Sequence, residues 1–523
     1  MEKYRDSRKK KKIASNLFIF VFSVYMVTAS EVKGQLGGDN HLRYQVTTSI
    51  VEKYDLSVPN GFGVKGKDGR FYSFYGLGWS VLAVPFYILG KYLGGGSESL
   101  VCVMQLLAGA VTVTFVFLFC VSLGYSYRPS VITAIFYGFG SMAWPLAKQP
   151  FEHVVETLFV LLSVYYMYLF YIKERNLCFI LSAVFIGIAL TIRLTAILVF
   201  PALFFIGGIF CLQNASLKYS MKILFKHVVM YLMVLLPFIF IIMWYNYYRF
   251  GSIYETGYQL IAAKTGLDFF YGTPLLTGLR GFLLSPGKGI FYYSPVALLF
   301  FPAIVPFYKK HSSLVIAFIM IITSYLLFLS KNIYWHGDWA WGPRYLLVIL
   351  PFLIIPVVEL LGKDTNKEIK KVSLRTAFIY GIFCIGIVIQ VAAVSVHCYK
   401  YFFDLQNEKN VNFILNKGNG VPDIFEPPPE VHFDWGMSPI LAQFQSIYEM
   451  GLRIGNYRHV NLPANAPLLE KTNALPIMHI YDFWWVYLYF IDRKQAGFLI
   501  AAALVGVCII SAYRLIITSL SQR

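Results

Sequence analysis

The sequence predicts an all-helical protein that crosses a membrane many times. Its 523 residues are 57% hydrophobic and only 14% charged, with a mean hydropathy of +0.60. An average soluble domain contains about 25% charged residues. Apolar stretches of roughly twenty residues, the length that a helix needs to cross a bilayer, recur along the chain. Basic loops separate alternate stretches.

About twelve apolar stretches are long enough to be membrane spans. They cover residues 13–30, 99–122, 131–147, 154–172, 177–192, 194–212, 227–247, 290–308, 313–330, 343–361, 374–397 and 494–518. Two of them are short and meet at Arg193, so 177–192 and 194–212 are alternatively a broken hairpin. The spans are otherwise nearly free of charge. The even number places both termini on the same side.

The cations set the orientation, because cytoplasmic loops of membrane proteins carry an excess of Lys and Arg. An unbroken run from Arg8 to Lys12 precedes the first stretch. The alternate loops after it are also basic, at 128, 173–175, 218–226, 309–310 and 363–375. This pattern places both termini in the cytoplasm. The segments predicted to lie outside are 31–98, 148–153, 248–289, 330–344 and 398–493.

Residues 76–93 form an ambiguous apolar segment, interrupted by Pro85 and followed by Lys91 and three glycines. Counting it as a span would put the cationic loops on the wrong sides. We therefore expect a helix that lies at the outer membrane interface. The predicted domains are a transmembrane domain over 1–397 with the outer loop 31–98, a loop-rich outer region over 398–493, and a last span with a cytoplasmic tail over 494–523.

Composition and the placement of charge also weigh against several classes of function. The net charge of +18 does not indicate nucleic-acid binding, because no basic patch lies on a soluble domain; basic inner loops that face anionic lipid explain it. The seven cysteines show no spacing typical of a metal site or a disulfide framework. A transporter would place ionisable groups near the middle of its spans. Here they gather in the outer loops, which favours an enzyme at the membrane surface.

Two acidic positions are candidate catalytic residues. Asp39 follows the first span, and Arg43 lies four residues later. Asp39 is either a general base for an acceptor or a helix N-cap with Arg43 as its ion partner. Glu152 and His153 precede the fourth stretch. Glu152 either complements the dipole of the helix that begins there or has a functional role. In the second case it orients the acceptor or holds a metal ion.

A third outer loop combines aromatic, acidic and basic residues in the order Trp335, His336, Asp338 and, after Gly-Pro, Arg344. Tryptophan rings stack on sugars and polyprenyl chains, and a guanidinium group binds phosphate through paired N–H groups. Cations in the glycine-rich segment 278–289 are further candidate phosphate ligands, and these are Arg280 and Lys288. The alternative for each single cation is contact with lipid headgroups.

Several of these segments together resemble a known family. They are Gly38-Asp39 with Arg43, the run 70–78 before the interfacial helix, Pro150-Phe151-Glu152-His153, and 341–346 at the start of a late span. The pattern is similar to the membrane glycosyltransferases of the GT-C fold. The branch it resembles contains the protein O-mannosyltransferases and the lipid A aminoarabinose transferase. The similarity covers most of residues 10–400. Relatives usually have Asp where this chain has Glu152.

The resemblance implies a GT-C fold and inverting transfer of a sugar from a polyprenyl phosphate to a protein, lipid or glycan acceptor. Asp39 would be the base and Arg344 would bind the carrier phosphate. The implied location is the cytoplasmic (inner) membrane of a prokaryote, with the active site on the outer face. No metal-ligating residue is assigned, and a divalent cation stays open. The alternatives are a transporter or flippase, and a non-catalytic scaffold protein.

Overall fold

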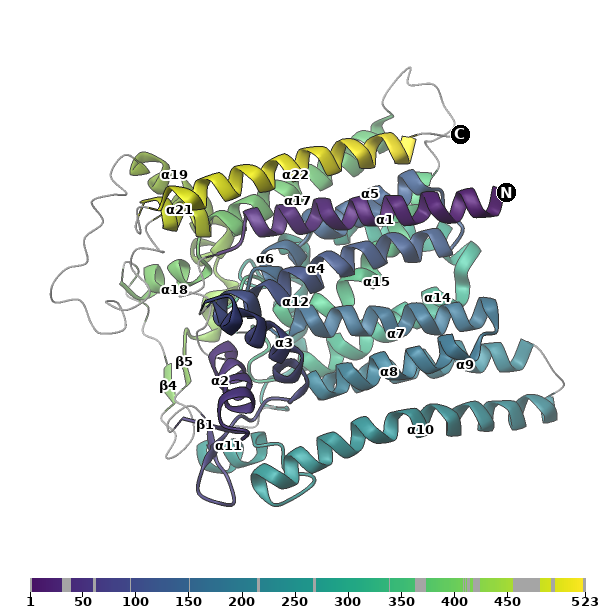
Figure 1. Cartoon of the computed structure of the whole chain (residues 1–523), viewed down its shortest axis with the longest axis horizontal. Coiled ribbons are helices and arrows are strands. Elements are labelled where there is room, and N and C mark those ends of the chain that lie inside the picture. The colour runs from purple at the N-terminus through teal and green to yellow at the C-terminus, as the bar shows by residue number, and fades with distance from the viewer. Residues whose placement is uncertain are drawn as a thin grey trace.

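Apolar helices that run side by side form the body of the molecule, and both chain termini lie at one end of it (Figure 1). The computed structural model describes the chain except for residues 1, 31–38, 60–62, 95, 150, 214–216, 267–269, 338, 363–372, 408, 410, 412–413, 417–423, 455–479, 491–493 and 521–523. Asp338 and most of the predicted inner loop 363–375 therefore lie outside the described residues.

Each predicted apolar stretch is largely helical in the structure, although α1 begins well before residue 13 and the stretch 131–147 is divided between α5 and α6. In chain order the helices of the bundle are α1 (Glu2–Val27), α4 (Ser97–Ser122), α5 (Tyr127–Phe139), α6 (Ala143–Ala147), α7 (His153–Lys173), α8 (Asn176–Ile192), η2 (Leu194–Val199), α9 (Phe200–Gln213), α10 (Leu217–Phe250), α13 (Ile290–Tyr293), η3 (Pro295–Leu299), α14 (Phe300–Leu329), η4 (Arg344–Ile349), α15 (Leu350–Ile354), η5 (Ile355–Val357), α16 (Val358–Leu361), α17 (Leu374–Ser395) and α22 (Gln495–Leu520), where η marks a 3₁₀ helix.

Within the described residues, seven helical runs are long and apolar enough to cross a membrane. They are Ser97–Ser122, His153–Lys173, Lys222–Phe250, Pro295–Leu329, Arg344–Leu361, Leu374–Ser395 and Gln495–Ser519. The run Arg344–Leu361 is 94% buried and forms the centre of the bundle, whereas Lys222–Phe250 is 17% buried and lies at its edge. The chain is therefore an integral membrane protein, and the total of about twelve spans stays a prediction.

The helix α14 consists of two parts that meet at a sharp bend. His311 leaves the helical conformation, with φ −137° and ψ 49°. The rings of Phe307 and Phe318 lie 6.5 Å apart, although eleven residues of straight helix rise about 16 Å. The chain therefore turns sharply at His311. This bend separates the two spans predicted over 290–308 and 313–330.

The first of the segments predicted to lie outside, called outer segments below, covers the end of the bundle opposite the termini (Figure 1). It contains α2 (Asp39–Glu52), α3 (Gly78–Tyr92) and the short strands β1 (Ser57–Val58), β2 (Val64–Lys65) and β3 (Phe71–Tyr72). The strands form an antiparallel sheet in the order β1-β3-β2, with Tyr72 opposite both Ser57 and Val64. A small apolar cluster of Leu42, Val46, Leu77 and Tyr245 fixes α2 against the end of α10.

The later outer segments lie at the same end. They contain α11 (Tyr258–Thr265), α12 (Leu275–Leu284), α18 (Cys398–Asn407), β4 (Ile414–Asn416), β5 (Ile424–Glu426), η7 (Pro429–Phe433), η8 (Trp435–Met437), α19 (Pro439–Leu452) and α21 (Trp484–Phe490). The described part of 398–493 packs closely on the bundle. Gly287 N donates to His432 O at 3.0 Å, and Trp484 N donates to Ala29 O at 2.9 Å. After α21 in the chain, the last helix, α22, runs back along the bundle beside α1 (Figure 1).

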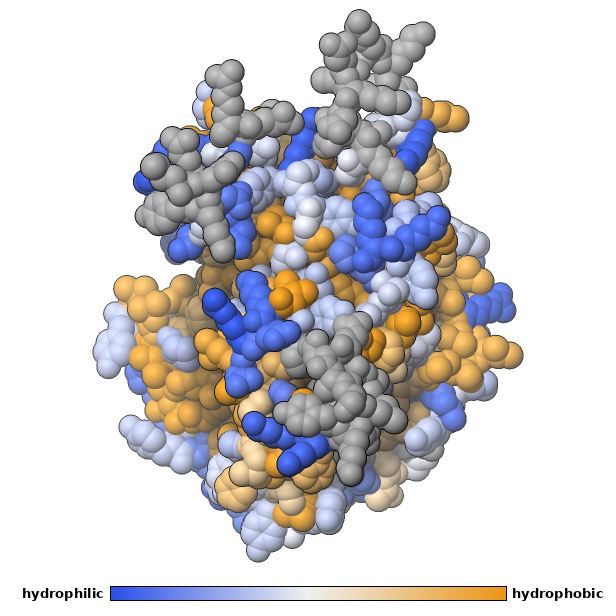
Figure 2. Space-filling view, turned by 90° about the vertical axis from the view of Figure 1, so that its right-hand side faces the viewer, coloured by the Kyte–Doolittle hydropathy of each residue, from blue (hydrophilic) through white to orange (hydrophobic). Residues whose placement is uncertain are grey.

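The end of the bundle that carries the termini is basic. Arg128 is the second residue of α5, Lys173 is the last residue of α7, and Arg175 lies in the turn between α7 and α8. Figure 2 faces this end and shows hydrophilic side chains gathered over its middle, with apolar side chains along the flanks. The apolar flanks fit a lipid environment, and the basic turns fit a cytoplasmic face.

Candidate active site

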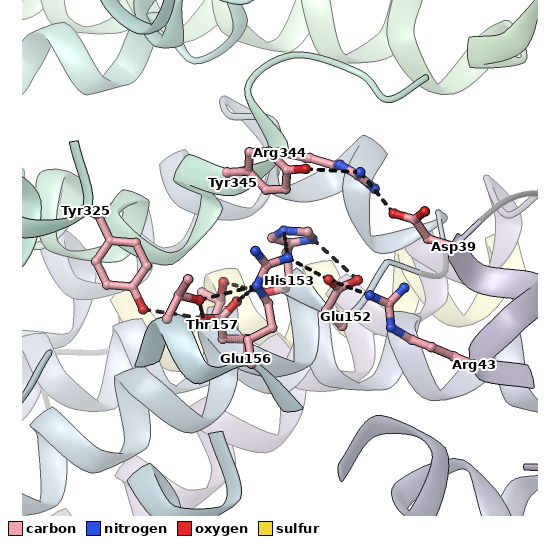
Figure 3. Close-up of polar contacts among 11 residues, drawn as sticks. Asp39, Arg43, Glu152, His153, Glu156, Thr157, Tyr325, Arg344 and Tyr345 are labelled. Atoms are coloured by element: carbon pink, nitrogen blue, oxygen red, sulfur yellow. Dashed lines mark hydrogen bonds and ion pairs between the residues drawn. The ribbon is translucent and has the colours of Figure 1, made fainter. Parts of the chain in front are cut away.

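Four helix ends bring charged side chains together at the end of the bundle opposite the basic turns. Asp39 is the first residue of α2, and Glu152 directly precedes α7. Arg193 lies in the break between α8 and η2, where its extended backbone (φ −144°, ψ 129°) interrupts the helix. Arg344 is the first residue of η4, after Pro343. Figure 3 shows the resulting cluster of side chains.

Glu152 is the centre of the cluster. Its Oε1 accepts from Arg43 Nη2 at 2.7 Å and from Arg193 Nη1 at 2.6 Å, and its side chain is 2% exposed. Burial raises the pKa of this carboxyl, but Arg43, Arg193 and Arg344 together outweigh that effect and hold the pKa below its usual range. Glu152 therefore stays ionised at neutral pH. Its ionised form balances part of the charge of the arginines around it.

Asp39 is the accessible carboxylate of the cluster. Its Oδ2 accepts from Arg344 Nη2 at 3.1 Å, and its side chain is 31% exposed, while Arg344 is 3% exposed. Asp39 thus pairs with Arg344, and Arg43 pairs with Glu152 (Figure 3). The sequence-based alternative of an ion pair between Asp39 and Arg43 within α2 is therefore not the arrangement in the structure.

Aromatic rings hold the guanidinium groups in place. Arg344 lies over the ring of Phe151, 4.1 Å from its centroid, and Arg43 lies 3.8 Å from the centroid of Tyr75. Burial raises the pKa of the Tyr75 hydroxyl well above its usual value, and the charge of nearby Asp39 adds to this. Tyr75 therefore stays protonated at neutral pH and lies beside both functional residues of α2.

A second carboxylate, Glu156, supports Arg193 one helical turn further into α7. Glu156 Oε2 lies 3.5 Å from Arg193 Nε, and Glu156 Oε1 accepts from Thr195 Oγ1 at 3.1 Å and from Tyr325 OH at 3.3 Å. Arg193 Nη1 also lies 2.7 Å from His153 Nε2. Because a guanidinium group only donates, His153 accepts through Nε2. Arg193 is thus held on both sides by residues of α7.

Five of the predicted site residues meet in this cluster, and these are Asp39, Arg43, Glu152, His153 and Arg344. Four residues of the cluster were not predicted, and these are Tyr75, Glu156, Arg193 and Tyr345. Arg193 was detectable as the main charge among the apolar stretches. Tyr75 and Tyr345 gave no signal, because the sequence contains 38 tyrosines.

The other predicted residues that the structure describes lie in a second cluster, next to the loop that leads to Arg344. Lys288 Nζ donates to the carbonyl oxygens of Ala340 at 2.8 Å and Gly342 at 3.3 Å. Trp335, 1% exposed, packs against the α12 ring of Phe282. His336 stacks on His432 with ring centroids 4.7 Å apart. Arg280 is exposed and lies over Phe433. The substrate-binding roles expected for this set stay predictions, and Asp338 lies outside the described residues.

The donor set of the main cluster does not fit a divalent cation. Among the described residues, no group of three or more His, Cys, Asp or Glu side chains is arranged to hold a metal ion. Asp39 Oδ2 and Glu152 Oε1 already bind guanidinium groups. Hard cations such as Mg²⁺ and Ca²⁺ need several oxygen ligands, and three arginines surround the carboxylates here.

Comparison with known proteins gives a distant structural likeness. No protein-family model and no curated protein matches the chain. The apo oligosaccharyltransferase of Archaeoglobus fulgidus is 11% identical over 74% of this chain and 57% of its own, with a TM-score of 0.45. A form of that enzyme tethered to an acceptor peptide gives the same identity and TM-score. The complex of the enzyme, AglB, with an inhibitory peptide and a dolichol-phosphate is 12% identical, covers 91% of this chain and 63% of its own, and has a TM-score of 0.42.

The chain spans less than two thirds of the length of this archaeal enzyme. At such similarity, neither family nor activity follows from the likeness. What the structure itself defines is an integral membrane protein with a buried arginine–carboxylate cluster at one end of its bundle. The function is inferred from that cluster.

Proposed function

We propose that the chain is a membrane glycosyltransferase that moves a sugar from a polyprenyl phosphate to an acceptor at the outer face of a prokaryotic cytoplasmic membrane. The observation that supports this most is the meeting of one accessible carboxylate, Asp39, with the guanidinium groups of Arg43, Arg193 and Arg344. Guanidinium groups suit an anionic phosphate, and a carboxylate suits an acceptor proton.

The position of the cluster supports a lipid-linked donor. Its residues lie at one end of long apolar helices, with the basic turns at the other end (Figures 1 and 2). If the basic end is cytoplasmic, the cluster faces the outer side. A carrier lipid keeps its chain in the bilayer and its phosphate at that level. Nucleotide-activated sugars are not expected on that side, so a donor already linked to the carrier fits the site.

The proposed reaction is a single displacement at the anomeric carbon. The acceptor oxygen forms the new bond, and the bond from the anomeric carbon to the phosphate oxygen breaks. The electron pair of that bond leaves with the phosphate, and Asp39 takes the acceptor proton. Arg344 stabilises the charge on the departing phosphate. A guanidinium group has five N–H donors, so Arg344 is able to bind phosphate and still orient Asp39.

Glu152 has a different role in this proposal. Its side chain is 2% exposed and its Oε1 binds two arginines, so it is placed to position Arg43 and Arg193. Asp39 is the carboxylate that an acceptor reaches. The protein, lipid or glycan nature of the acceptor stays open. We also propose that the chain has a GT-C fold and belongs to the branch that contains the protein O-mannosyltransferases.

The test is transfer by the purified full-length chain with a panel of radiolabelled polyprenyl-phosphate sugars and a membrane extract as acceptor source. We expect Asp39→Asn to lower turnover by at least about a hundred-fold, the range of a general base. Asp68→Asn is the matched control, because Asp68 is 32% exposed and pairs with Arg70 in the same outer segment. Full transfer by Asp39→Asn would show that Asp39 is not the base.

A further inference from the structure

The three guanidinium groups of the cluster converge on a single carboxylate. Arg43 and Arg193 bind Glu152 Oε1 directly, and Arg344 also acts on this carboxylate. Arg344 and Arg193 both lie near the Tyr345 ring, at 5.1 Å and 5.2 Å from its centroid. The cations thus come from three different parts of the chain and reach one small region. Three guanidinium groups in one small region supply N–H donors for an anion, and the carboxylates of Asp39, Glu152 and Glu156 offset much of their charge.

The cluster holds an open donor. Arg43 Nη1 is buried and has no hydrogen-bond partner among the residues that the structure describes, while the side chain as a whole is 2% exposed. An unsatisfied buried donor is costly, and a charged one more so. A phosphate oxygen beside Arg43 Nη1 would satisfy it with a charge-assisted hydrogen bond. Arg193, with 21% of its side chain exposed, is the most accessible of the three arginines.

The carboxylates of the cluster are occupied by these arginines and by hydroxyl groups. Asp39 Oδ2 binds Arg344, and Glu156 Oε1 accepts from Thr195 and Tyr325. Among the described residues, Glu152 Oε2 and His153 Nδ1 have no hydrogen-bond partner, and they lie 3.7 Å apart. A catalytic zinc ion takes three protein ligands, and no group of three His, Cys, Asp or Glu side chains in the described part of the chain is arranged to hold a metal ion.

We propose that this site binds its phosphate through Arg43, Arg193 and Arg344 alone, without a divalent cation, and that Arg193 is a ligand-binding residue. Glu152 and Glu156 are positioning residues that hold Arg193 from both sides. The identity of the phosphate as that of a polyprenyl carrier rests on the proposed function. The absence of a metal requirement rests on the donor set.

The first experiment measures binding of undecaprenyl phosphate to the full-length wild type in detergent, with undecaprenol as the uncharged control. We expect the Kd to change by less than about two-fold after treatment with EDTA, and addition of MgCl₂ or MnCl₂ not to tighten it, because guanidinium groups supply the charge. Loss of binding with EDTA and its return with either cation would overturn the proposal. Equal affinity for the phosphate and the alcohol would also overturn it.

The second experiment compares Arg193→Gln and Arg193→Lys with Arg70→Gln, whose arginine pairs with carboxylates outside the site. We expect both Arg193 variants to bind the phosphate more weakly, Arg193→Gln by about ten-fold or more, since Lys lacks the forked donor geometry. Arg193→Lys keeps the charge and covers the case in which Arg193→Gln does not fold. Unchanged binding in folded variants would refute the role of Arg193. Metal-independent binding without sugar transfer would refute the proposed function only.

Discussion

Tyr75 lies beside both functional residues of α2. Its hydroxyl is near the Asp39 carboxylate, and its ring lies 3.8 Å from the guanidinium group of Arg43. Substitution by Phe therefore removes the polar group beside Asp39 and keeps the ring beside Arg43. We expect Tyr75→Phe to lower kcat on the order of ten-fold, because it removes a polar neighbour of the charged base. The affinity for the polyprenyl-phosphate donor should stay unchanged, because the ring remains beneath Arg43.

The control for this substitution is Tyr72→Phe. Tyr72 is a tyrosine beside a carboxylate outside the cluster, and its hydroxyl donates to Asp68 at 2.7 Å. Steady-state kinetics with varied donor concentration measure kcat and KM separately. An equal loss in both variants would mean that Tyr75 serves only the stability of the outer segment.

The sequence identified individual charged residues of the candidate site, but not the contacts between them. Asp39, Arg43, Glu152, His153 and Arg344 stand out because charge is rare next to apolar spans. Their pairing was not predictable, since it joins side chains from segments far apart in the chain, such as Arg43 and Glu152. Glu156 lies inside a predicted span, and only its contact with Arg193 shows that it belongs to the cluster.

At the scale of elements, the loop between α14 and η4 sets the position of Arg344. Gly337 has φ +70°, and a Cβ atom there would lie 3.0 Å from Arg344 Cγ and 3.2 Å from its Nε. We expect Gly337→Ala to displace the guanidinium group and to raise the KM for the donor by roughly ten-fold or more, since small misplacements in active sites are costly. Donor saturation curves measure the change.

Gly94→Ala is the matched control for the backbone. Gly94 has φ +100° in the loop after α3, and no atom lies within 4 Å of a Cβ placed there. The Gly94→Ala substitution therefore introduces comparable backbone strain without a contact to the site. Loss of donor affinity in both variants would show that strain alone, and not displacement of Arg344, is the cause.

Most helices were predictable from the sequence, because the thickness of the bilayer sets the length of a membrane span. The predicted spans 99–122 and 374–397 therefore differ little from α4 and α17. The region 398–493 was predicted as a separate loop-rich unit. These domain bounds stay a prediction. The described part of the region packs against the bundle, where Lys148 Nζ and Asp482 Oδ2 form a buried ion pair at 2.9 Å. Contacts between residues so distant in the chain leave no local pattern.

At the scale of the whole molecule, charge is distributed unequally between the two ends of the bundle. The termini, the start of α5 with Arg128, and the α7–α8 junction with Lys173 and Arg175 lie at one end, and the arginine–carboxylate cluster lies at the other (Figure 1). We expect Asp68→Cys to react with a membrane-impermeant thiol reagent in intact cells. Arg175→Cys should react only after permeabilisation. The reverse labelling pattern would place the cluster on the cytoplasmic side.

The most direct test of the central claim is release of polyprenyl phosphate, coupled to sugar transfer, by the purified wild-type chain. The account predicts that one radiolabelled polyprenyl-phosphate sugar is consumed and its sugar appears on an acceptor. Asp39→Asn is expected to lose this activity and Asp68→Asn to keep it. If the folded wild type binds such donors but neither transfers nor hydrolyses any of them with any acceptor preparation, the chain is not a glycosyltransferase of this kind.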